Sequence, residues 1–336
     1  MISFTVFKGS PSGDIIQDET TTPSLKANEV LLKHTHSGVC GTDLHYLHTS
    51  MVLGHEGVGI VQALGESVTG FERQKSGDRL GFGYAKDGCG TCKQCLKGYT
   101  FQCEFSPRYF AGTDLDQGSF AEYSVWPSTR LVKLPNEIES ADAGPFMCAG
   151  QTVFVPMLRN GFKKDDRVGV IGIGGLGHLA IQFANAFGCE VVVFSSSDNK
   201  KEEAMSFGAK EFWNTKNLKA EDVKKLDHLV VTTSAQPNWE LYADLMAPFG
   251  HIYPLTIADG NLSFPYLPLI LKELSIHGSC SSSIEEVEKM LAFIVKHGIK
   301  PTIEKFPMTV EGIEQAIKKL RTGEIRYRAV LEVQQS

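Results

Sequence analysis

The segment Gly172-Ile173-Gly174-Gly175-Leu176-Gly177 constrains the fold of this chain more than any other feature. It lies between an apolar run and an amphipathic helical stretch, and it matches the pattern G-x-G-x-x-G. The first glycine of that pattern makes a tight turn, the second lets the backbone approach a pyrophosphate, and the third lets the helix pack on the strand. A phosphate then lies at the helix N-terminus, where free N–H groups attract an anion. The sequence therefore predicts a dinucleotide site made by Gly172, Gly174, Gly175, Leu176 and Gly177.

Short apolar runs and helical stretches alternate in the middle of the chain. The apolar runs, which favour strands, are 168–171, 190–194 and 229–232. Two helical stretches, 176–187 and 200–207, lie between them. Strand and helix in alternation indicate a doubly wound parallel sheet, an α/β fold of the Rossmann type.

The N-terminal part has a different character, because turn residues there separate short apolar runs and predict a mostly β domain. The C-terminal part has helical stretches at 284–297 and 310–321 and a strand-like run at 328–333. From these elements alone it could close the β domain or extend the parallel sheet. We expect a β-rich catalytic domain over 1–149, completed by about 285–336, and a nucleotide-binding domain over 150–284. Two domains suit a chain of 336 residues.

The residues after the second predicted strand indicate which nucleotide is bound. An NAD site usually has Asp or Glu about 20 residues after the glycines, where it accepts a hydrogen bond from the ribose 2′-OH. This chain has Ser195, Ser196 and Ser197 there, followed by Lys200. Hydroxyls and an amine suit a 2′-phosphate, although Asp198 is close enough in sequence to reach the ribose. We therefore expect NADP(H) as the cofactor.

The overall charge and hydropathy exclude some classes of partner. A formal net charge of -6 gives no electrostatic reason for binding nucleic acid or an anionic membrane. Apolar runs fall short of the roughly 20 residues of a membrane helix. The first residues also lack the basic start and apolar stretch of a signal peptide. We expect a cytoplasmic protein whose partner is a small molecule, with no nucleic acid and no membrane.

Four of the eight cysteines are closely spaced, which indicates a metal site. They are Cys89, Cys92, Cys95 and Cys103, in the pattern C-x2-C-x2-C-x7-C. Two-residue gaps let successive thiolates converge on one tetrahedral ion, and four thiolates leave no open position, as in structural zinc sites. Iron–sulfur clusters also use four cysteines, but the Cys-Pro ending of one such pattern is missing. We expect a closed structural zinc site, and buried thiols without a role at Cys189 and Cys280.

Two short motifs carry further side chains of the metal-binding kind. The first is Gly38-Val39-Cys40-Gly41-Thr42-Asp43-Leu44-His45, and the second is Gly54-His55-Glu56-Gly57. Cysteine, histidine and carboxylate suit a zinc ion that keeps an open coordination position. Each motif alone is a weak signal, because a single cysteine or histidine is more often part of a core.

The order of these motifs along the chain resembles the zinc-containing medium-chain dehydrogenases. Within that family, the stretch 38–45, the stretch 116–121 and Cys148-Ala149-Gly150 are similar to the cinnamyl alcohol dehydrogenase group. The resemblance covers nearly the whole chain. It implies a GroES-like fold for the β-rich domain and a homodimer joined through the nucleotide domains.

The resemblance also implies roles for individual residues. The catalytic zinc ligands are Cys40, His55 and Cys148, with Glu56 beside the metal as an alternate ligand. Asp43 orients His55, as ligating imidazoles usually require. Thr42 and His45 match the positions of the family's proton relay to solvent.

These roles together predict a zinc-dependent alcohol dehydrogenase or aldehyde reductase with two zinc ions per chain. It transfers hydride between NADP(H) and a primary alcohol or aldehyde, aromatic (cinnamyl-type) or medium-chain aliphatic. A zinc-dependent polyol dehydrogenase is one alternative, and a non-enzymatic zinc- and NADP-binding module is another. A zinc-free quinone reductase of the same fold should lack both the four-cysteine segment and the Gly-His-Glu motif, and this chain has both.

One segment departs from the family pattern. Only 15 positions separate Cys40 from His55, where we expect a longer loop with an extra turn after Leu47-His48. The departure affects the nearby substrate wall and leaves the ligands in place. Candidates for that wall are Tyr46, Phe110 and Trp126, although each residue type is more often plain core or surface.

Overall fold

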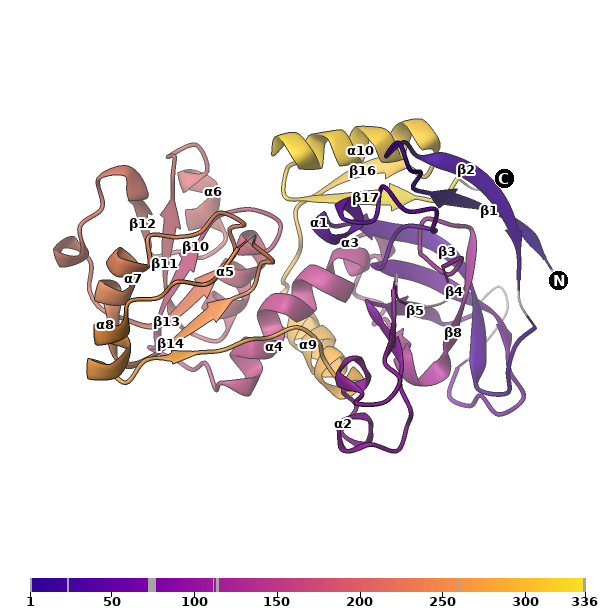
Figure 1. Cartoon of the computed structure of the whole chain (residues 1–336), viewed down its shortest axis with the longest axis horizontal. Helices are drawn as coiled ribbons and strands as arrows, with labels where there is room; N and C mark the ends of the chain where they lie inside the picture. The colour runs from indigo at the N-terminus through magenta and orange to yellow at the C-terminus, as the bar shows by residue number, and fades with distance from the viewer. Residues whose placement is uncertain are drawn as a thin grey trace. The chain divides into compact units, whose positions relative to one another are not determined.

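The computed structural model divides the chain into two compact units (Figure 1). Unit 1 comprises Met1–Gln151 and Ser281–Ser336, and unit 2 comprises Thr152–Cys280. The structure describes residues 2–22, 24–71, 77–110, 112, 115–258 and 260–334. The domain boundaries expected from the sequence lie at 149/150 and 284/285.

A parallel sheet forms the centre of unit 2. Its strands are β10 (Arg167–Ile171), β11 (Glu190–Ser195), β12 (Glu211–Asn214), β13 (Leu226–Val231), β14 (Met246–Pro254) and β15 (Ser275–Ile276). They lie in the order β12-β11-β10-β13-β14-β15, each pair parallel. Its helices are α4 (Gln151–Arg159), which starts at the boundary, α5 (Gly177–Ala186), α6 (Lys201–Ser206), α7 (Trp239–Leu245) and α8 (Tyr266–Leu271). The first strand lies in the middle, between β11 and β13, which is the order of doubly wound dinucleotide-binding folds. The predicted α/β fold is confirmed.

Unit 1 is mostly β. Its larger sheet contains β3 (Glu29–Val39), β4 (Gly57–Leu64), β5 (Arg79–Phe82), β8 (Tyr123–Pro127), β9 (Val132–Lys133), β16 (Ile303–Pro307) and β17 (Arg328–Glu332). The order is β16-β17-β3-β4-β5-β9, and β8 also pairs with β3. Smaller pairs join β1 (Ser3–Lys8) to β2 (Ile16–Thr21) and β6 (Ala85–Asp87) to β7 (Arg108–Tyr109). The helices are α1 (Gly41–Leu44), α2 (Lys93–Leu96), α3 (Ser140–Pro145), α9 (Ile284–His297) and α10 (Val310–Thr322). Because β17 pairs with β3, the C-terminal residues close the β unit and do not extend the parallel sheet.

The two long C-terminal helices begin and end at residues that satisfy their free backbone groups. Ser283 caps α9 in a capping box with Glu286, and the Thr309 hydroxyl caps α10. The helices end at Gly298 and Gly323, whose φ angles of 65° and 71° suit glycine. These signals are local, so the predicted stretches 284–297 and 310–321 agree with α9 and α10 to within one residue.

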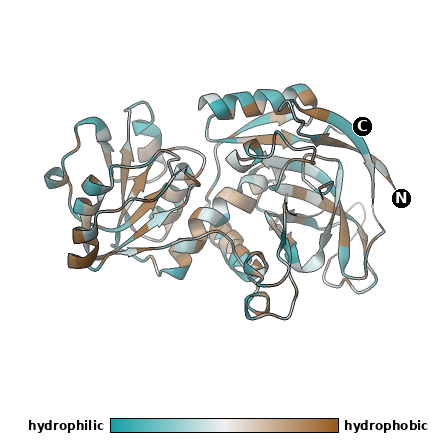
Figure 2. Cartoon of the chain, in the orientation of Figure 1, coloured by the Kyte–Doolittle hydropathy of each residue, from teal (hydrophilic) through white to brown (hydrophobic). Residues whose placement is uncertain are grey.

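Each unit has its own apolar core. In unit 2, Val192, Leu229 and Ile252 are buried together beneath the parallel sheet's helices. In unit 1, Phe120 of the loop before β8 is buried with Ile313 of α10. Figure 2 shows hydrophobic residues gathered on the strands of the parallel sheet and hydrophilic residues on much of α10. Within the described ranges, helices fall short of the length and apolar content that a bilayer crossing requires.

Candidate active site

Four side chains of the metal-ligating kind converge in unit 1: Cys40, His55, Glu56 and Cys148. One ligand atom from each lies within 4.8 Å of the others. Cys40 follows β3 and precedes α1, whereas His55 and Glu56 precede β4. Cys148 lies in a π-helical turn, Phe146–Gly150, between α3 and α4. The structure therefore brings together, from distant parts of the chain, the four side chains that the family resemblance implies as ligands.

Asp43 fixes the orientation of His55. Its buried carboxylate lies 3.1 Å from His55 Nδ1 and accepts hydrogen bonds from the backbone N–H groups of Cys40 and Gly54, at 2.9 and 3.2 Å. Burial lowers the pKa of His55, but the Asp43 carboxylate and the Cys40 thiol raise it well above its usual value. The carboxylate favours a proton on Nδ1, so Nε2 is the nitrogen that can bind a metal once it is deprotonated. His55 Nε2 is fully buried and has no hydrogen-bond partner among the described residues. A buried, unpartnered imidazole nitrogen aimed at two thiols is what a metal ligand requires.

The sulfur atoms have the spacing of two ligands on one zinc ion. Tetrahedral coordination with Zn–S bonds of about 2.3 Å places two sulfurs about 3.8 Å apart. Cys40 Sγ and Cys148 Sγ lie 3.9 Å apart, and neither forms a disulfide. A hydrogen bond from the Cys148 thiol lowers the pKa of Cys40, assisted by His55 and opposed by burial. These residues fit a zinc ion with one position left for substrate.

Glu56 forms a buried ion pair with Arg328 of β17. Its Oε1 accepts from Arg328 Nη2, while Oε2 has no partner among the described residues. Burial raises the pKa of Glu56 to about 7, against the opposing effect of Arg328. Gly38 makes room for this carboxylate, since a Cβ there would collide with Oε2. Arg328 was not predicted from the sequence, where its only signal is a charge at the start of an apolar strand.

Thr42 and His45 lie on the same short helix segment as Cys40. The Thr42 hydroxyl lies 3.7 Å from Cys40 Sγ. His45 follows α1 directly, its side chain is exposed, and its backbone N–H bonds to the Thr42 carbonyl. One residue is thus beside the cluster and the other at the surface, which is the placement that a proton relay to solvent needs.

The short segment between Cys40 and His55 is hydrogen-bonded to the residues that follow β1. Leu47 and Met51 are buried, and their carbonyls accept hydrogen bonds from the backbone of Ser10 and Gly9, at 2.9 and 3.2 Å. The residues that follow β1 therefore cover the segment where the extra turn was expected. The ligands on either side of it still converge.

Aromatic side chains surround His55. The rings of Phe110 and Tyr84 lie 5.1 and 5.6 Å from the imidazole, and the Tyr46 and Tyr84 hydroxyls lie 3.1 Å apart. Tyr84 was not predicted, because it belongs to no motif. Trp126 does not lie here: it is buried and stacked on Phe82 at 4.2 Å, so it is a core residue, as its type suggested.

The four closely spaced cysteines form a second group in unit 1, which we call the cysteine lobe (88–106). Their ligand atoms lie within 4.8 Å of one another, and Cys89–Cys95 and Cys92–Cys103 are each 4.0 Å apart. Backbone N–H groups of Ser106 and Cys89 point at Cys103 Sγ and lower the pKa of Cys103 to about 6. Such N–H donors stabilise thiolates, so the lobe also fits a metal ion.

Of the remaining cysteines, Cys189 is buried, as expected. Cys280 is exposed, so the prediction of a buried thiol there is wrong. It lies in the stretch between β15 and α9 and is the last residue of unit 2.

The glycine-rich turn lies between β10 and α5 in unit 2. Gly172 has a φ of 91°, which other residues rarely adopt, and a Cβ on Gly177 would collide with the Gly172 carbonyl. Gly174 and Gly175 occupy the turn, and Leu176 precedes the first residue of α5. The turn is therefore shaped for close approach of a ligand to backbone N–H groups.

Ser195 ends β11, and Ser196 and Ser197 follow it in the adjacent turn. Lys200 reaches back to the glycine-rich turn, where its Nζ lies 3.1 Å from the Ile173 carbonyl. Asp198 Oδ2 accepts from the Asn214 amide at 3.0 Å and so is engaged by β12. The hydroxyls and the lysine are thus grouped at the end of β11.

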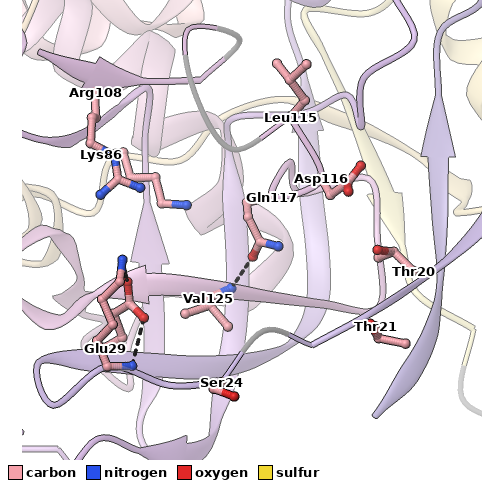
Figure 3. Close-up of a pocket in the computed structure, with 11 residues that line it drawn as sticks. Thr20, Thr21, Ser24, Glu29, Lys86, Arg108, Leu115, Asp116, Gln117 and Val125 are labelled. Atoms are coloured by element: carbon pink, nitrogen blue, oxygen red, sulfur yellow. Dashed lines mark hydrogen bonds and ion pairs between the residues drawn. The ribbon is translucent and has the colours of Figure 1, made fainter. Parts of the chain in front are cut away.

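A separate pocket of about 280 Å³ lies in unit 1 (Figure 3). Its polar wall includes Lys86 and Gln117, and Lys86 Nζ also lies 5.2 Å from the centre of the Trp126 ring. Several of its charges are paired: Lys26 with Glu29 at 3.1 Å, Asp116 with Lys8 at 3.3 Å, and Arg108 with Asp87 at 3.7 Å. Residues of the two cysteine-containing groups are absent from its lining, so this pocket is not the candidate active site.

Comparison with known proteins identifies the family. The family model described as "Alcohol dehydrogenase GroES-like domain" matches residues 26–136, and "Zinc-binding dehydrogenase" matches residues 175–296. Aldehyde reductase AdhA of Synechocystis sp. is 37% identical over 317 residues, which cover 92% of this chain and 92% of that protein. The chain belongs to the zinc-containing medium-chain dehydrogenases.

Two further relatives place this medium-chain dehydrogenase in the cinnamyl alcohol dehydrogenase group. "Probable cinnamyl alcohol dehydrogenase 9" of Arabidopsis thaliana is 34% identical over 326 residues, covering 92% of this chain and 89% of that protein. A solved cinnamyl alcohol dehydrogenase of Sorghum bicolor superposes with a TM-score of 0.91 at 28% identity, covering 98% of each chain. The family predicted from the order of motifs is confirmed.

Proposed function

We propose that this medium-chain dehydrogenase is a zinc-dependent, NADP(H)-using alcohol dehydrogenase whose main direction is aldehyde reduction. As a member of its family it is an oxidoreductase of alcohols and aldehydes. One observation carries the proposal: Cys40, His55 and Cys148 converge, with His55 Nε2 buried and unpartnered within the described structure. When bound, zinc acts as a Lewis acid on the substrate oxygen, and the nicotinamide carries the hydride.

The test is turnover of a panel of aromatic and medium-chain aliphatic aldehydes with NADPH, followed at the nicotinamide absorbance. The aromatic side chains of Tyr46, Tyr84 and Phe110 beside His55 support aromatic substrates. If polyols with NAD are turned over faster than any aldehyde with NADPH, the chain is the alternative polyol dehydrogenase. If the zinc-loaded protein binds NADPH and turns over none of these substrates, the non-enzymatic binding module is the better description.

The cofactor proposal rests on the end of β11. In this proposal, Ser195, Ser196, Ser197 and Lys200 bind the 2′-phosphate of NADP(H), while the glycine-rich turn binds the pyrophosphate. A charge-assisted hydrogen bond to phosphate contributes roughly 1.5–3 kcal/mol. That corresponds to about one to two decades in affinity.

We expect Lys200→Ala to lower kcat/KM for NADPH about tenfold to a hundredfold and to leave that for NADH nearly unchanged. Initial rates at varied concentrations of each coenzyme measure both values. Lys201→Ala is the matched control, because Lys201 is the exposed first residue of α6 and lies one position away. Equal efficiency of NADH and NADPH in the unmodified enzyme would contradict the 2′-phosphate site.

The proton path rests on Thr42 and His45. In aldehyde reduction the product oxygen needs a proton, and the Thr42 hydroxyl beside Cys40 can donate one. His45, which is exposed, would pass protons between water and Thr42 once the cofactor is bound. Alcohol oxidation uses the same groups in the opposite direction.

His45→Ala is expected to slow alcohol oxidation about tenfold to a hundredfold. General acid–base catalysis typically contributes roughly 10²- to 10⁴-fold, and the expected loss lies at or below the low end of that range because water can bypass a surface relay. The loss should shrink at high pH, where hydroxide takes the proton. The pH–rate profile and the zinc content of the variant are the measurements. Full activity at every pH would leave His45 without a relay role, and loss of zinc would make it a ligand.

We also propose two zinc ions per chain, one in the catalytic group and one in the cysteine lobe. The support is that the described residues form two separate groups with metal-ligand spacing, at Cys40 and at Cys89. We retain the cytoplasmic location as a prediction.

The homodimer is also a proposal. Strand β15 is at the end of the sheet of unit 2, with β14 as its paired neighbour. The preceding helix, α8, exposes four large apolar side chains: Tyr266, Leu267, Ile270 and Leu271. An open sheet edge beside exposed apolar side chains is typical of a subunit interface. Sedimentation of the purified protein tests this proposal.

A further inference from the structure

The turn that carries Cys148 has an unusual backbone and an unusual neighbour. Phe146–Gly150 is a π-helical turn, a local departure that is frequent at functional sites. The carbonyl of Met147, the residue before Cys148, accepts a hydrogen bond of 2.6 Å from the side-chain amide of Gln151. This contact is close-packed, because a Cβ on Gly83 would lie 2.5 Å from the Met147 oxygen and 3.1 Å from Gln151 Nε2. Gln151 therefore holds the backbone on which Cys148 is presented.

The other end of the Gln151 amide is engaged as well. Gln151 Oε1 accepts a hydrogen bond from the hydroxyl of Ser282, which is buried. Gln151 is the last residue of the first segment of unit 1, and Ser282 is the second residue of the other segment. One amide thus joins the two places where the chain passes between the units, and it does so within unit 1.

Arg130 continues this chain of contacts into the cysteine lobe. Its Nη2 donates to the Ser282 carbonyl at 3.4 Å, and its Nη1 donates to the Gly98 carbonyl at 3.1 Å. Gly98 follows α2 in the lobe, and a Cβ there would lie 2.9 Å from the Cβ of Ser283. The Arg130 side chain is buried and its guanidinium is permanently charged. A structure in which it lost its hydrogen bonds to these two carbonyls would therefore be unfavourable.

A second contact docks the lobe on the same segment. The Tyr99 hydroxyl lies 3.4 Å from Glu286 Oε1, in the first turn of α9. The segment 281–286 is therefore held by the lobe on one side and by Gln151 on the other. Buried networks of this kind keep one geometry, because each partner depends on the next.

We propose that Gln151 is a positioning residue for Cys148, and that Ser282 and Arg130 make the position of Cys148 depend on an intact cysteine lobe. The proposal rests on the proposed function in one respect, since it takes Cys148 as a metal ligand. When a group that hydrogen-bonds to a metal-ligating residue is removed, the metal affinity typically falls 10- to 100-fold. Gln151 acts on the ligand through the backbone of its neighbour, so we expect an effect of about tenfold.

The first test replaces Gln151 in the zinc-loaded enzyme with Met, which has a similar length and makes neither hydrogen bond. We expect the catalytic zinc to pass to a chromophoric chelator about tenfold faster, with the lobe zinc unaffected. Alkylation of Cys148 by iodoacetamide, measured by peptide mass spectrometry, should rise relative to that of Cys40. Release and alkylation at unmodified rates would overturn the positioning role.

Gln151→Glu separates hydrogen bonding from packing. A carboxylate can accept from Ser282 but cannot donate to the Met147 carbonyl, whereas a protonated carboxyl can do both. We expect Gln151→Glu to release the catalytic zinc faster than the unmodified enzyme at pH 8, where the introduced carboxyl is ionised and cannot donate to the Met147 carbonyl. Release at the rate of the unmodified enzyme would show that the donated hydrogen bond is not needed and would contradict the proposal.

Arg130→Met tests the dependence on the lobe. We expect the ratio of Cys148 to Cys40 alkylation to rise several-fold, with Arg167→Met as the control because Arg167 is a buried arginine of unit 2. If Arg130→Met changes the release of the lobe zinc and leaves the alkylation ratio unchanged, the position of Cys148 does not depend on the lobe. The proposed role of Arg130 is then wrong. If the unmodified enzyme holds no zinc at Cys40 and Cys148, the proposed function fails, while the alkylation ratio still decides the role of Gln151.

Discussion

His55→Ala is expected to lower kcat/KM about 10³-fold and to remove one of two zinc ions per chain. Lewis-acid stabilisation by a metal ion contributes several kcal/mol to the transition state, and roughly 1.4 kcal/mol corresponds to a factor of ten. His55 provides the imidazole nitrogen of the catalytic group, and its Nε2 is fully buried. The remaining thiols, Cys40 and Cys148, cannot hold the ion in a fixed geometry alone. Metal analysis and steady-state kinetics on the same preparation measure both effects.

Two control variants distinguish loss of a ligand from loss of structure. His34 is also a buried histidine, and its ring nitrogens contact the Ala121 carbonyl at 2.8 Å and the Ser124 hydroxyl at 2.7 Å. His34→Ala should therefore reduce stability and keep both zinc ions. Cys92→Ser should remove the lobe zinc and lower stability more than it alters catalysis. If His55→Ala retains both zinc ions, the ligand set is wrong.

Arg328→Met is expected to reduce the free energy of unfolding of unit 1 by about 3–5 kcal/mol. Removing one partner of a buried ion pair leaves the other charge uncompensated, and the cost lies in that range. Glu56 is fully buried, and its Oε1 loses the guanidinium. Urea unfolding of the purified enzyme, followed by tryptophan fluorescence and circular dichroism, measures the loss.

A double variant tests whether the charge itself is the cause. Glu56→Gln added to Arg328→Met removes the orphaned carboxylate, so it should recover a large part of the lost stability. Lys319→Met serves as the surface control, because its pair with Glu304 is partly exposed and contributes no more than about 1 kcal/mol. A double variant as unstable as Arg328→Met alone would contradict the buried-charge explanation.

The sequence predicted the elements whose signals are local. Apolar runs marked β10 and β11, the glycine pattern marked the turn before α5, and a helical stretch at 284–297 marked α9. Each of these depends on residues close together in the chain, where spacing and residue type suffice. The doubly wound order followed from the alternation of strand and helix.

The sequence could not predict contacts that depend on the folded chain. Glu56 and Arg328 are 272 positions apart, and no local pattern relates them. Tyr84 reaches His55 only because unit 1 folds around it, and Gln151 looks like an ordinary residue at the start of a helix. The partner of the C-terminal strand could not be predicted either. The composition of β17 suits both sheets, and only the folded chain shows that it pairs with β3.

The position of β17 between β16 and β3 sets an order of events during synthesis on the ribosome. Unit 2 is continuous in sequence, so it can fold once residue 280 has left the exit tunnel. Unit 1 cannot: until Arg328 and its neighbours emerge, one edge of β3 lacks a partner strand and Glu56 lacks its cation. An unpaired strand edge is a template for aggregation, so a chain that lacks its last residues should aggregate more readily than the complete one.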